Sequence, residues 1–240
     1  MRQHLDTIPV WEAYQSGCEC PLCHLEARND AIYVDNFLGG SVMEPSVRIE
    51  VNKKGFCAPH LRALYDKKNR LGLALMEHTH LMECIQKIEA QSFEKKSLFA
   101  RKDAPATDLI SQGCIICERL ENTLYRYALT LCYMWPHEQA FKEALSKSKG
   151  FCNPHYALMQ KAALEELSGG PLSELQRELK RVQLENLRRI EKEIEWFTLK
   201  FDYRNQDKPW GTSEDAVERT ANKLRTRAIR NEEPPSPPKY

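Results

Sequence analysis

Two nearly identical heptapeptides contain the residues best suited to bind a metal. They are Lys54-Gly55-Phe56-Cys57-Ala58-Pro59-His60 and Lys149-Gly150-Phe151-Cys152-Asn153-Pro154-His155. A Cys-x-x-Cys pair precedes each heptapeptide, with 33 residues between Cys23 and Cys57 and 34 between Cys117 and Cys152. A Cys-x-x-Cys pair brings two sulfurs to one side of a turn, and Cys-x-x-His does the same at the first turn of a helix. Each copy therefore supplies four ligands for a tetrahedral metal site.

Sequence order groups these eight ligands by copy. The first copy contributes Cys20, Cys23, Cys57 and His60, and the second contributes Cys114, Cys117, Cys152 and His155. Three thiolates and one imidazole suit structural zinc, so we expect two Zn²⁺ ions, with an iron–sulfur cluster as the alternative. Buried thiols around a core histidine are a simpler interpretation, which the matched repetition disfavours. Four protein ligands leave no open position, so the sites are expected to be structural rather than catalytic.

The remaining cysteines and nearby cations receive simpler interpretations. Cys20-Pro21-Leu22-Cys23-His24 fits a haem-attachment pattern, but the second copy has Glu118 at the place of His24, so haem is not expected. Cys18 is a substitute ligand, a reactive thiol or an incidental residue. Lys54 and Lys149 stand at matching places and are expected to offset the charge of a site with three thiolates. The expected core residues are Cys84, Cys132, Met76, Met82 and Trp135.

Helical periodicity dominates the segments that must position these ligands. Ile116, Leu120, Leu124, Tyr127 and Leu131 recur at helical spacing, which predicts one buried stripe. We expect an all-α fold of two tandem pseudo-repeats, each fixed by one metal site and ended by a long helix. The predicted parts are a first repeat (1–99), a linker (100–108), a second repeat (109–205), a C-terminal helical extension (206–230) and a disordered Pro-rich tail (231–240).

One cluster outside the ligand sets has the composition of a ligand-binding groove. It comprises Asp202, Tyr203, Arg204, Asn205 and Trp210, with Arg204 as the anion contact. The competing interpretation, which we favour, is a packed turn in which Arg204 pairs with Asp202 or caps carbonyl groups.

Composition excludes several classes of protein. The chain has 240 residues, a net charge of +1 and 42% hydrophobic residues, without the basic excess of a nucleic-acid-binding protein. No apolar run is long enough to span a membrane, and the N-terminus shows no signal-peptide core, so we expect a cytoplasmic protein. Thiols stay reduced in that compartment, which favours metal ligation over disulfides for these cysteines.

Several motifs together resemble an uncharacterised bacterial family of cytoplasmic proteins, a domain of unknown function. They are the paired Gly-Phe-Cys-x-Pro-His segments with their upstream Cys-x-x-Cys, then Phe201-Asp202-Tyr203-Arg204-Asn205 and Trp210-Gly211. The resemblance extends to about residue 230 and implies this architecture without an activity. The metal positions that it implies are Cys20, Cys23, Cys57, His60, Cys114, Cys117, Cys152 and His155.

Three functions are compatible with these features. The first is a non-enzymatic, zinc-stabilised binding or adaptor protein whose partner is a protein or a small molecule. The second is a thiol-based redox sensor or oxidoreductase that uses the Cys-x-x-Cys pairs. The third is nucleic-acid association through the basic segment 219–230, which is disfavoured because four or five phosphate contacts give only weak, salt-dependent binding.

Overall fold

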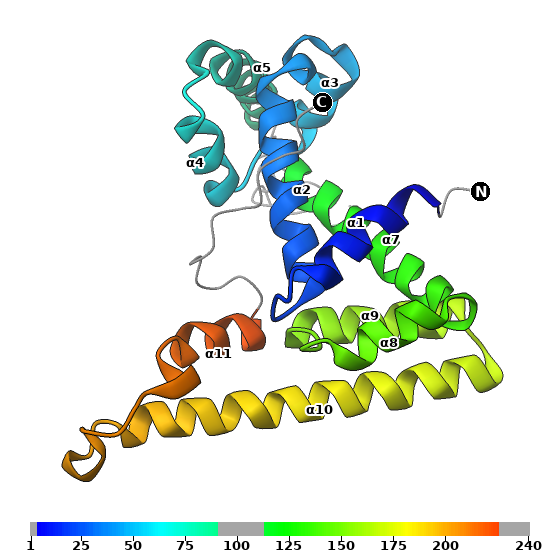
Figure 1. The fold of residues 1–240 in the computed structure, drawn as a ribbon. Helices are drawn as coiled ribbons and strands as arrows, with labels where there is room; N and C mark the ends of the chain where they lie inside the picture. Colours follow the sequence, from blue (N-terminus) through cyan, green and yellow to red (C-terminus); the bar gives the residue numbers. More distant parts are fainter. Residues whose placement is uncertain (1–3, 91–112, 226–240) are drawn as a thin grey trace, which may run out of the picture. The chain divides into compact units, whose positions relative to one another are not determined.

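A computed structural model describes residues 4–90 and 113–225, and within those ranges it is built from helices without a strand. The all-α prediction is therefore confirmed (Figure 1). The first helices are α1 (His4–Gln15), α2 (Pro21–Leu38), η1 (Gly40–Met43), α3 (Pro45–Lys54), α4 (Ala58–Asp66) and α5 (Arg70–Glu89). The later ones are α7 (Ile115–His137), α8 (Gln139–Lys147), α9 (Asn153–Glu166), α10 (Gly169–Leu199), η2 (Tyr203–Asn205), η3 (Gly211–Ser213) and α11 (Ala216–Arg225).

The helices repeat in the order that the motifs indicate. In each copy the Cys-x-x-Cys segment begins a helix (α2 or α7), a short helix follows (α3 or α8), the Cys-x-x-His segment begins the next (α4 or α9), and a long helix closes the set (α5 or α10). The predicted linker (100–108) and Pro-rich tail (231–240) lie outside the described residues. None of the described helices is long and apolar enough to cross a membrane.

The compact units of the fold do not coincide with the sequence repeats. One unit combines residues 1–28 with 122–240, and the other comprises residues 29–121. Both boundaries fall inside helices, because α2 and α7 each contribute residues to both units. The repeats expected at 1–99 and 109–205 stay a prediction from sequence similarity, and the two compact units divide the chain differently.

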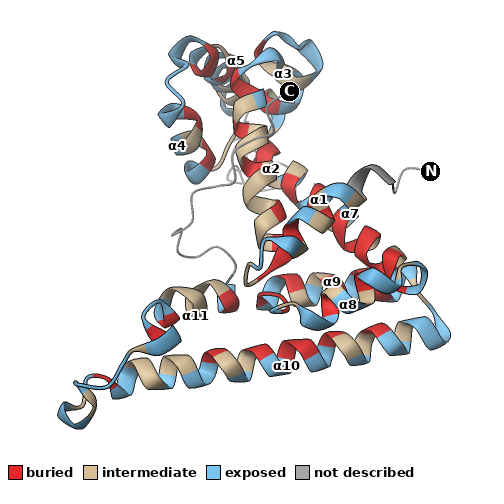
Figure 2. Ribbon diagram, viewed as in Figure 1, coloured by how far each residue is buried: buried red, intermediate tan, exposed pale blue. Residues whose placement is uncertain are grey.

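The larger unit has a core made by α1, the start of α2 and helices α7 to α10. Its fully buried side chains include Leu22, Leu131, Met134, Phe141 and Phe151. Figure 2 shows buried positions recurring along α7 and α10. Helix α10 packs on α8, α9 and α11 through a stripe of buried residues with helical spacing; they are Leu175, Leu179, Val182, Gln183, Asn186 and Ile190. Two polar residues in that stripe, Gln183 and Asn186, contact the segment that precedes Cys152.

The smaller unit packs the end of α2 and the start of α7 against α3, α4 and α5. Its core contains Val34, Phe37, Val42, Val51, Leu64, Leu73, Met76, Ile115, Ile116 and Leu120. Helix α3 contributes Val51, which is fully buried. Two expectations on α5 are wrong, because its C-terminal half faces outward: Met82 is 47% exposed and Cys84 is half-buried. Cys132 and Trp135 are buried as expected.

Candidate metal centres

The eight predicted ligands form two clusters, but the clusters are crossed between the repeats. Cys20 and Cys23 of the first repeat meet Cys152 and His155 of the second, and we call this group the Cys20 centre. Cys57, His60, Cys114 and Cys117 form the other group, the Cys114 centre. In each group the ligand atoms lie within 4.8 Å of one another. Grouping the ligands by repeat, as sequence order suggests, is therefore wrong.

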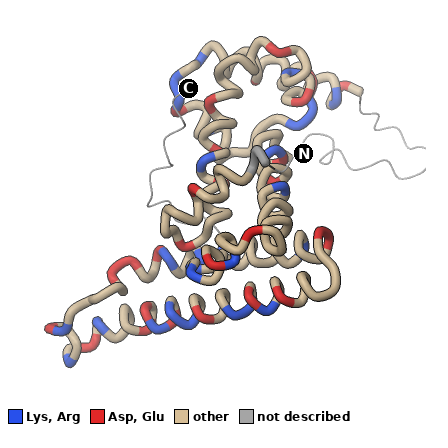
Figure 3. The backbone as a smooth tube through the Cα atoms, turned by 45° about the vertical axis from the view of Figure 1, so that its right-hand side comes forward, with Lys and Arg blue, Asp and Glu red and all other residues tan. Residues whose placement is uncertain are grey.

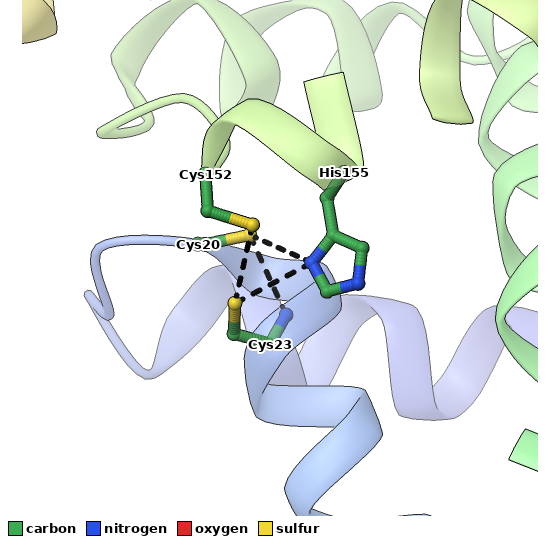
Figure 4. Close-up of side chains that lie close together, drawn as sticks. All are labelled: Cys20, Cys23, Cys152 and His155. Atoms are coloured by element: carbon green, nitrogen blue, oxygen red, sulfur yellow. Dashed lines mark hydrogen bonds between the residues drawn. The ribbon is translucent and has the colours of Figure 1, made fainter. Parts of the chain in front are cut away.

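The Cys20 centre joins the start of α2 to the start of α9 (Figure 4). Nδ1 of His155 lies 3.5 Å from Sγ of Cys20 and 3.4 Å from Sγ of Cys23. The sulfurs of Cys23 and Cys152 are 3.5 Å apart, and the backbone N–H of Cys23 points to Sγ of Cys20 at 3.4 Å. Cys20, Cys152 and His155 are buried and Cys23 is half-buried. All four ligands belong to the larger unit.

The Cys114 centre joins the start of α4 to the start of α7 and lies within the smaller unit. Nδ1 of His60 lies 3.1 Å from Sγ of Cys57, 3.2 Å from Sγ of Cys114 and 3.4 Å from Sγ of Cys117. The sulfurs of Cys57 and Cys117 are 3.7 Å apart. A single histidine nitrogen thus faces all three sulfurs.

These spacings match a tetrahedron around one ion. Metal–ligand bonds of about 2.3 Å for sulfur and 2.0–2.1 Å for nitrogen place two sulfurs about 3.8 Å apart and sulfur about 3.6 Å from nitrogen. The sulfur pairs at 3.5 and 3.7 Å fall close to the first value, and the sulfur–nitrogen pairs, from 3.1 to 3.5 Å, are all shorter than the second, by up to about 0.5 Å. A disulfide would need sulfurs about 2.05 Å apart. The donor sets therefore fit a four-coordinate zinc ion.

Four helix N-termini create these centres. Cys57 and Cys152 are the N-cap residues of α4 and α9, and Cys20 and Cys114 immediately precede α2 and α7. The carbonyl of each of these cysteines accepts the N–H four residues later, so each helix starts at a ligand. The second ligand of each pair follows three residues on, in the first turn. Unpaired N–H groups and the helix dipole at such ends favour thiolates.

The glycine before each Phe-Cys pair has a positive φ and is pressed against the long helix of its own repeat. Gly55 has φ +65°, and a Cβ there would lie 2.5 Å from Nε2 of His80 on α5. Gly150 has φ +71°, and its Cβ would lie 3.0 Å from Oε1 of Gln183 on α10. Only glycine combines this conformation with this close approach. The long helices thereby fix the loops that carry Cys57 and Cys152.

A carboxylate faces the outer nitrogen of each histidine. Nε2 of His60 hydrogen-bonds Oδ1 of Asp30 at 3.0 Å, and both residues are buried. Nε2 of His155 lies 3.9 Å from Oε2 of Glu26, beyond direct hydrogen-bond distance. Because Asp30 accepts the Nε2 proton, the Nδ1 lone pair of His60 is directed at the metal position, an arrangement common around zinc-bound histidines. A carboxylate therefore hydrogen-bonds the histidine directly in the Cys114 centre, whereas the carboxylate of the Cys20 centre lies farther from its histidine.

The protonation of the Cys114 centre without metal follows from these contacts. Burial disfavours the His60 cation, but the hydrogen bonds to Asp30 and Cys114 outweigh it and raise the pKa of His60 to about 10. Burial acts to raise the pKa of Cys114, yet His60 and the backbone N–H groups of Cys117 and Cys57 lower it to about 6. Burial and the neighbouring Cys114 raise the pKa of Cys117. Metal binding must therefore displace the His60 proton, whereas Cys114 is already a thiolate at neutral pH.

The cysteines of the Cys20 centre lie close together, and two of them, Cys20 and Cys152, are buried. Burial and then the neighbouring sulfurs of Cys152 and Cys23 raise the pKa of Cys20 well above its usual range. An ion that accepts electron pairs from all three sulfurs removes this mutual repulsion, because a coordinating thiol loses its proton. The centre thus has a chemical reason to hold a cation.

The other expected residues lie outside both clusters. Cys18 is half-buried with Sγ 3.6 Å from the carbonyl of Ala13, and His24 is not a member of either ligand group. Lys54 pairs with Glu118, and Lys149 lies 3.8 Å from Glu19. Each lysine therefore lies beside a carboxylate, and its expected role in offsetting the charge of the thiolates stays a prediction.

The turn after α10 holds its polar groups in local contacts. Nη2 of Arg204 lies 2.6 Å from Oδ2 of Asp202, whose Oδ1 also accepts the backbone N–H of Arg204 at 2.9 Å. Nδ2 of Asn205 donates to the carbonyl of Leu199, Trp210 packs on Phe197 and Phe201, and Tyr203 is exposed. These contacts agree with the packed-turn interpretation of the cluster formed by Asp202, Tyr203, Arg204, Asn205 and Trp210.

Three supporting residues were missed by the sequence reasoning. Asp30 supports His60, Gln183 contacts Phe151 beside Cys152, and Lys223 reaches both loops of the Cys20 centre. Asp30 lies 30 residues from His60 in the sequence, and Gln183 and Lys223 lie even farther along the chain from the residues that they contact. The only available signal was a polar residue at a buried position of a helical stripe, which applies to Gln183.

Comparison with known proteins agrees with the resemblance drawn from the motifs. Residues 1–231 match the family described as "Family of unknown function (DUF6062)". The chain is also 25% identical over 195 residues to an "Uncharacterized 23.9 kDa protein in xynA 3'region" of Caldicellulosiruptor sp. (strain Rt8B.4); the alignment covers 78% of this chain and 84% of that protein. No solved structure matches it. The chain therefore belongs to the family of unknown function DUF6062.

Proposed function

We propose that this protein binds two Zn²⁺ ions, one at the Cys20 centre and one at the Cys114 centre, and that both ions are structural. The observation that carries the proposal is the presence of two groups of three cysteines and one histidine, each with its ligand atoms within 4.8 Å of one another. Because four protein ligands complete a tetrahedron, each ion would link two helix N-termini rather than activate a substrate.

The donor chemistry supports zinc in preference to an iron–sulfur cluster. A mixed set of three sulfurs and one histidine nitrogen is a standard zinc set, whereas most clusters use cysteines alone. In both centres the distances also match a single ion. A cluster with bridging sulfides would need wider spacing between its ligands.

On this basis we propose a non-enzymatic binding or adaptor protein of the cytoplasm, with a protein or small molecule as its partner. The cysteine-rich ligand sets suit a reducing compartment. Association with nucleic acid is less well supported, because Arg219 and Lys223 of the basic C-terminal segment are engaged by Glu193 and Glu19. The long helix α10 also carries interspersed acidic and basic residues rather than a face of one sign (Figure 3).

Thiol redox chemistry remains a second candidate because of one distance. The sulfurs of Cys23 and Cys152 lie 3.5 Å apart, and Cys23 is half-buried. A peroxide that accepts two electrons from these two thiols would be reduced to water or an alcohol, and the thiols would form a disulfide after a small movement and release the ion. The same centre would then act as a sensor that releases zinc on oxidation.

Elemental analysis of the purified protein tests the main proposal. We expect two zinc ions per chain, and one in Cys23→Ser or Cys117→Ser. Cys18→Ser and Cys84→Ser change half-buried cysteines outside the ligand groups and should keep both ions. Absence of stoichiometric zinc in the wild-type protein, or loss of an ion in either control, would refute the assignment. Zinc release by mild peroxide that a thiol reductant reverses would favour the sensor.

A further inference from the structure

Lys223 of helix α11 is a buried cation that contacts both loops of the Cys20 centre. Its Nζ donates to the backbone carbonyl of Glu19 at 2.6 Å and to that of Lys149 at 2.5 Å. It also lies 3.4 Å from Oε2 of Glu19. The residue is only 2% exposed. Three N–H donors of one ammonium thus meet three oxygens.

Both carbonyl groups belong to residues that position metal ligands. Glu19 immediately precedes Cys20, and Lys149 begins the Lys-Gly-Phe-Cys loop that ends at Cys152. The two loops come from different repeats, 130 residues apart in the chain, and the single ammonium joins them. Lys223 therefore links the two loops by hydrogen bonds, as a metal ion would link them by coordination.

The side chains around Lys223 hold it at this point. Helix α11 packs against α9 and α10. Glu19 in turn receives Nη2 of Arg189 at 2.6 Å, and Arg219 of α11 pairs with Glu193. Removing the ammonium would leave the buried carbonyl oxygens of Glu19 and Lys149 without this donor, which is costly for buried acceptors, whereas Oε2 of Glu19 would keep its bond from Arg189.

The charge of Lys223 also complements that of the centre. Three thiolates and a neutral imidazole around Zn²⁺ carry a net charge near −1. Burial lowers the pKa of Lys223, and the nearby charges of Glu19 and Cys20 oppose that effect. In the smaller unit, a histidine instead contacts the end of α3, just before the loop that carries Cys57: Nδ1 of His80 lies 2.8 Å from the carbonyl of Asn52. The two centres therefore differ in how their loops are held.

We infer that Lys223 is a positioning residue of the Cys20 centre, so that metal retention at this centre, and not at the Cys114 centre, depends on helix α11. This inference rests on the proposed zinc binding and assigns a role to the C-terminal extension, which lies outside both sequence repeats. It makes the C-terminal helix the third element of the site, beside the starts of α2 and α9.

The test compares Lys223→Met with Lys200→Met. Lys200 is a matched control because it is also buried in the larger unit and donates to three backbone carbonyls, those of Asn205, Gln206 and Lys208. Its contacts lie in the turn after α10 rather than at a metal loop. Zinc transfer to a chromogenic chelator is measured for each full-length variant, and the two release phases are assigned with Cys23→Ser and Cys117→Ser.

Lys223→Met should accelerate zinc release from the Cys20 centre about 10- to 100-fold, the range by which loss of outer-sphere support lowers metal affinity, and leave the Cys114 centre unchanged. Lys200→Met should change neither phase. With Co²⁺ in place of zinc, the thiolate-to-metal charge-transfer band of the Cys20 centre should shift in Lys223→Met only, and Lys223→Arg should restore it. The inference would be overturned if both lysine variants had equal effects, or if Lys223→Met released zinc at the wild-type rate. A wild-type protein without two ions would instead refute the proposed function.

Discussion

The clamp that Gln183 forms on the loop before Cys152 allows a quantitative test of how the fold supports a metal ligand. Gln183 is 4% exposed on α10. Its Oε1 accepts the backbone N–H of Phe151 at 3.0 Å, and its Nε2 donates to the carbonyl of the same residue at 2.9 Å. One side chain therefore satisfies both polar groups of the residue beside the ligand. Phe151 is itself 1% exposed, so water cannot easily replace either bond.

Gln183→Leu keeps approximately the same volume but removes both partners. Each orphaned buried backbone group costs about 1–3 kcal/mol, so the two together should lower the free energy of unfolding by about 2–6 kcal/mol. The loss should fall on the larger unit, to which both residues belong. Gln183→Glu should lie between wild type and Gln183→Leu, because a carboxylate still accepts the Phe151 N–H but cannot donate to its carbonyl.

Urea unfolding of the zinc-loaded protein, followed by helical circular dichroism, measures this difference. Gln176→Leu is the matched control on the same helix, since Gln176 is half-buried and makes one long contact, 3.5 Å to Gln160. We expect the control to change stability by no more than about 0.5 kcal/mol. A Gln183→Leu variant that loses less than about 1 kcal/mol would show that this clamp does not support the loop.

Two further predictions concern the Cys114 centre. Asp30→Asn keeps an oxygen near His60 but removes the charge, so zinc dissociation from this centre should accelerate about 10- to 100-fold while the Cys20 centre is unchanged; equal acceleration at both centres in a chelator-transfer assay would contradict the carboxylate's role. In zinc-free protein, the lowered pKa of Cys114 (about 6) gives stability that is complete above its ordinary value near 9 and is lost as pH falls through 6. The raised pKa of His60 (about 10) gives stability that is complete below 6.5 and is lost as pH rises through 10. The urea midpoint of the chelated protein should therefore be nearly constant between about pH 6.5 and 9 and fall on both sides, and a continuous rise from pH 6 to 10 would contradict this reasoning.

The positions of the ligands were predictable because their signal is local. Cys-x-x-Cys and Cys-x-x-His each need only one tight turn or one helix start, and four such starts occur at the expected residues. The helices were predictable for the same reason, since an apolar stripe of period 3.6, as in α7, depends on neighbours within one element. The packed turn at Asp202 and Arg204 also follows from residues two positions apart.

The pairing of the ligand sets was not predictable, because either pairing satisfies the same spacing. Cys23 is 34 positions from Cys57 and 129 from Cys152, yet the structure brings it to Cys152. The choice is made by the cores, in which the start of α2 packs with α9 and the start of α7 with α4. Outer contacts such as those of Lys223 depend on the same long-range packing, as does the outward position of Met82 on α5.

The crossed pairing is the central claim, and the zinc content of two double variants tests it most directly. Cys23→Ser with Cys152→Ser removes two ligands of one centre and should leave one zinc ion per chain, the same as either single variant. Cys23→Ser with Cys57→Ser removes one ligand from each centre and should leave none firmly bound. The reverse result, with no zinc in the first double variant and one ion in the second, would show that each ion is held within a single repeat and would contradict the account.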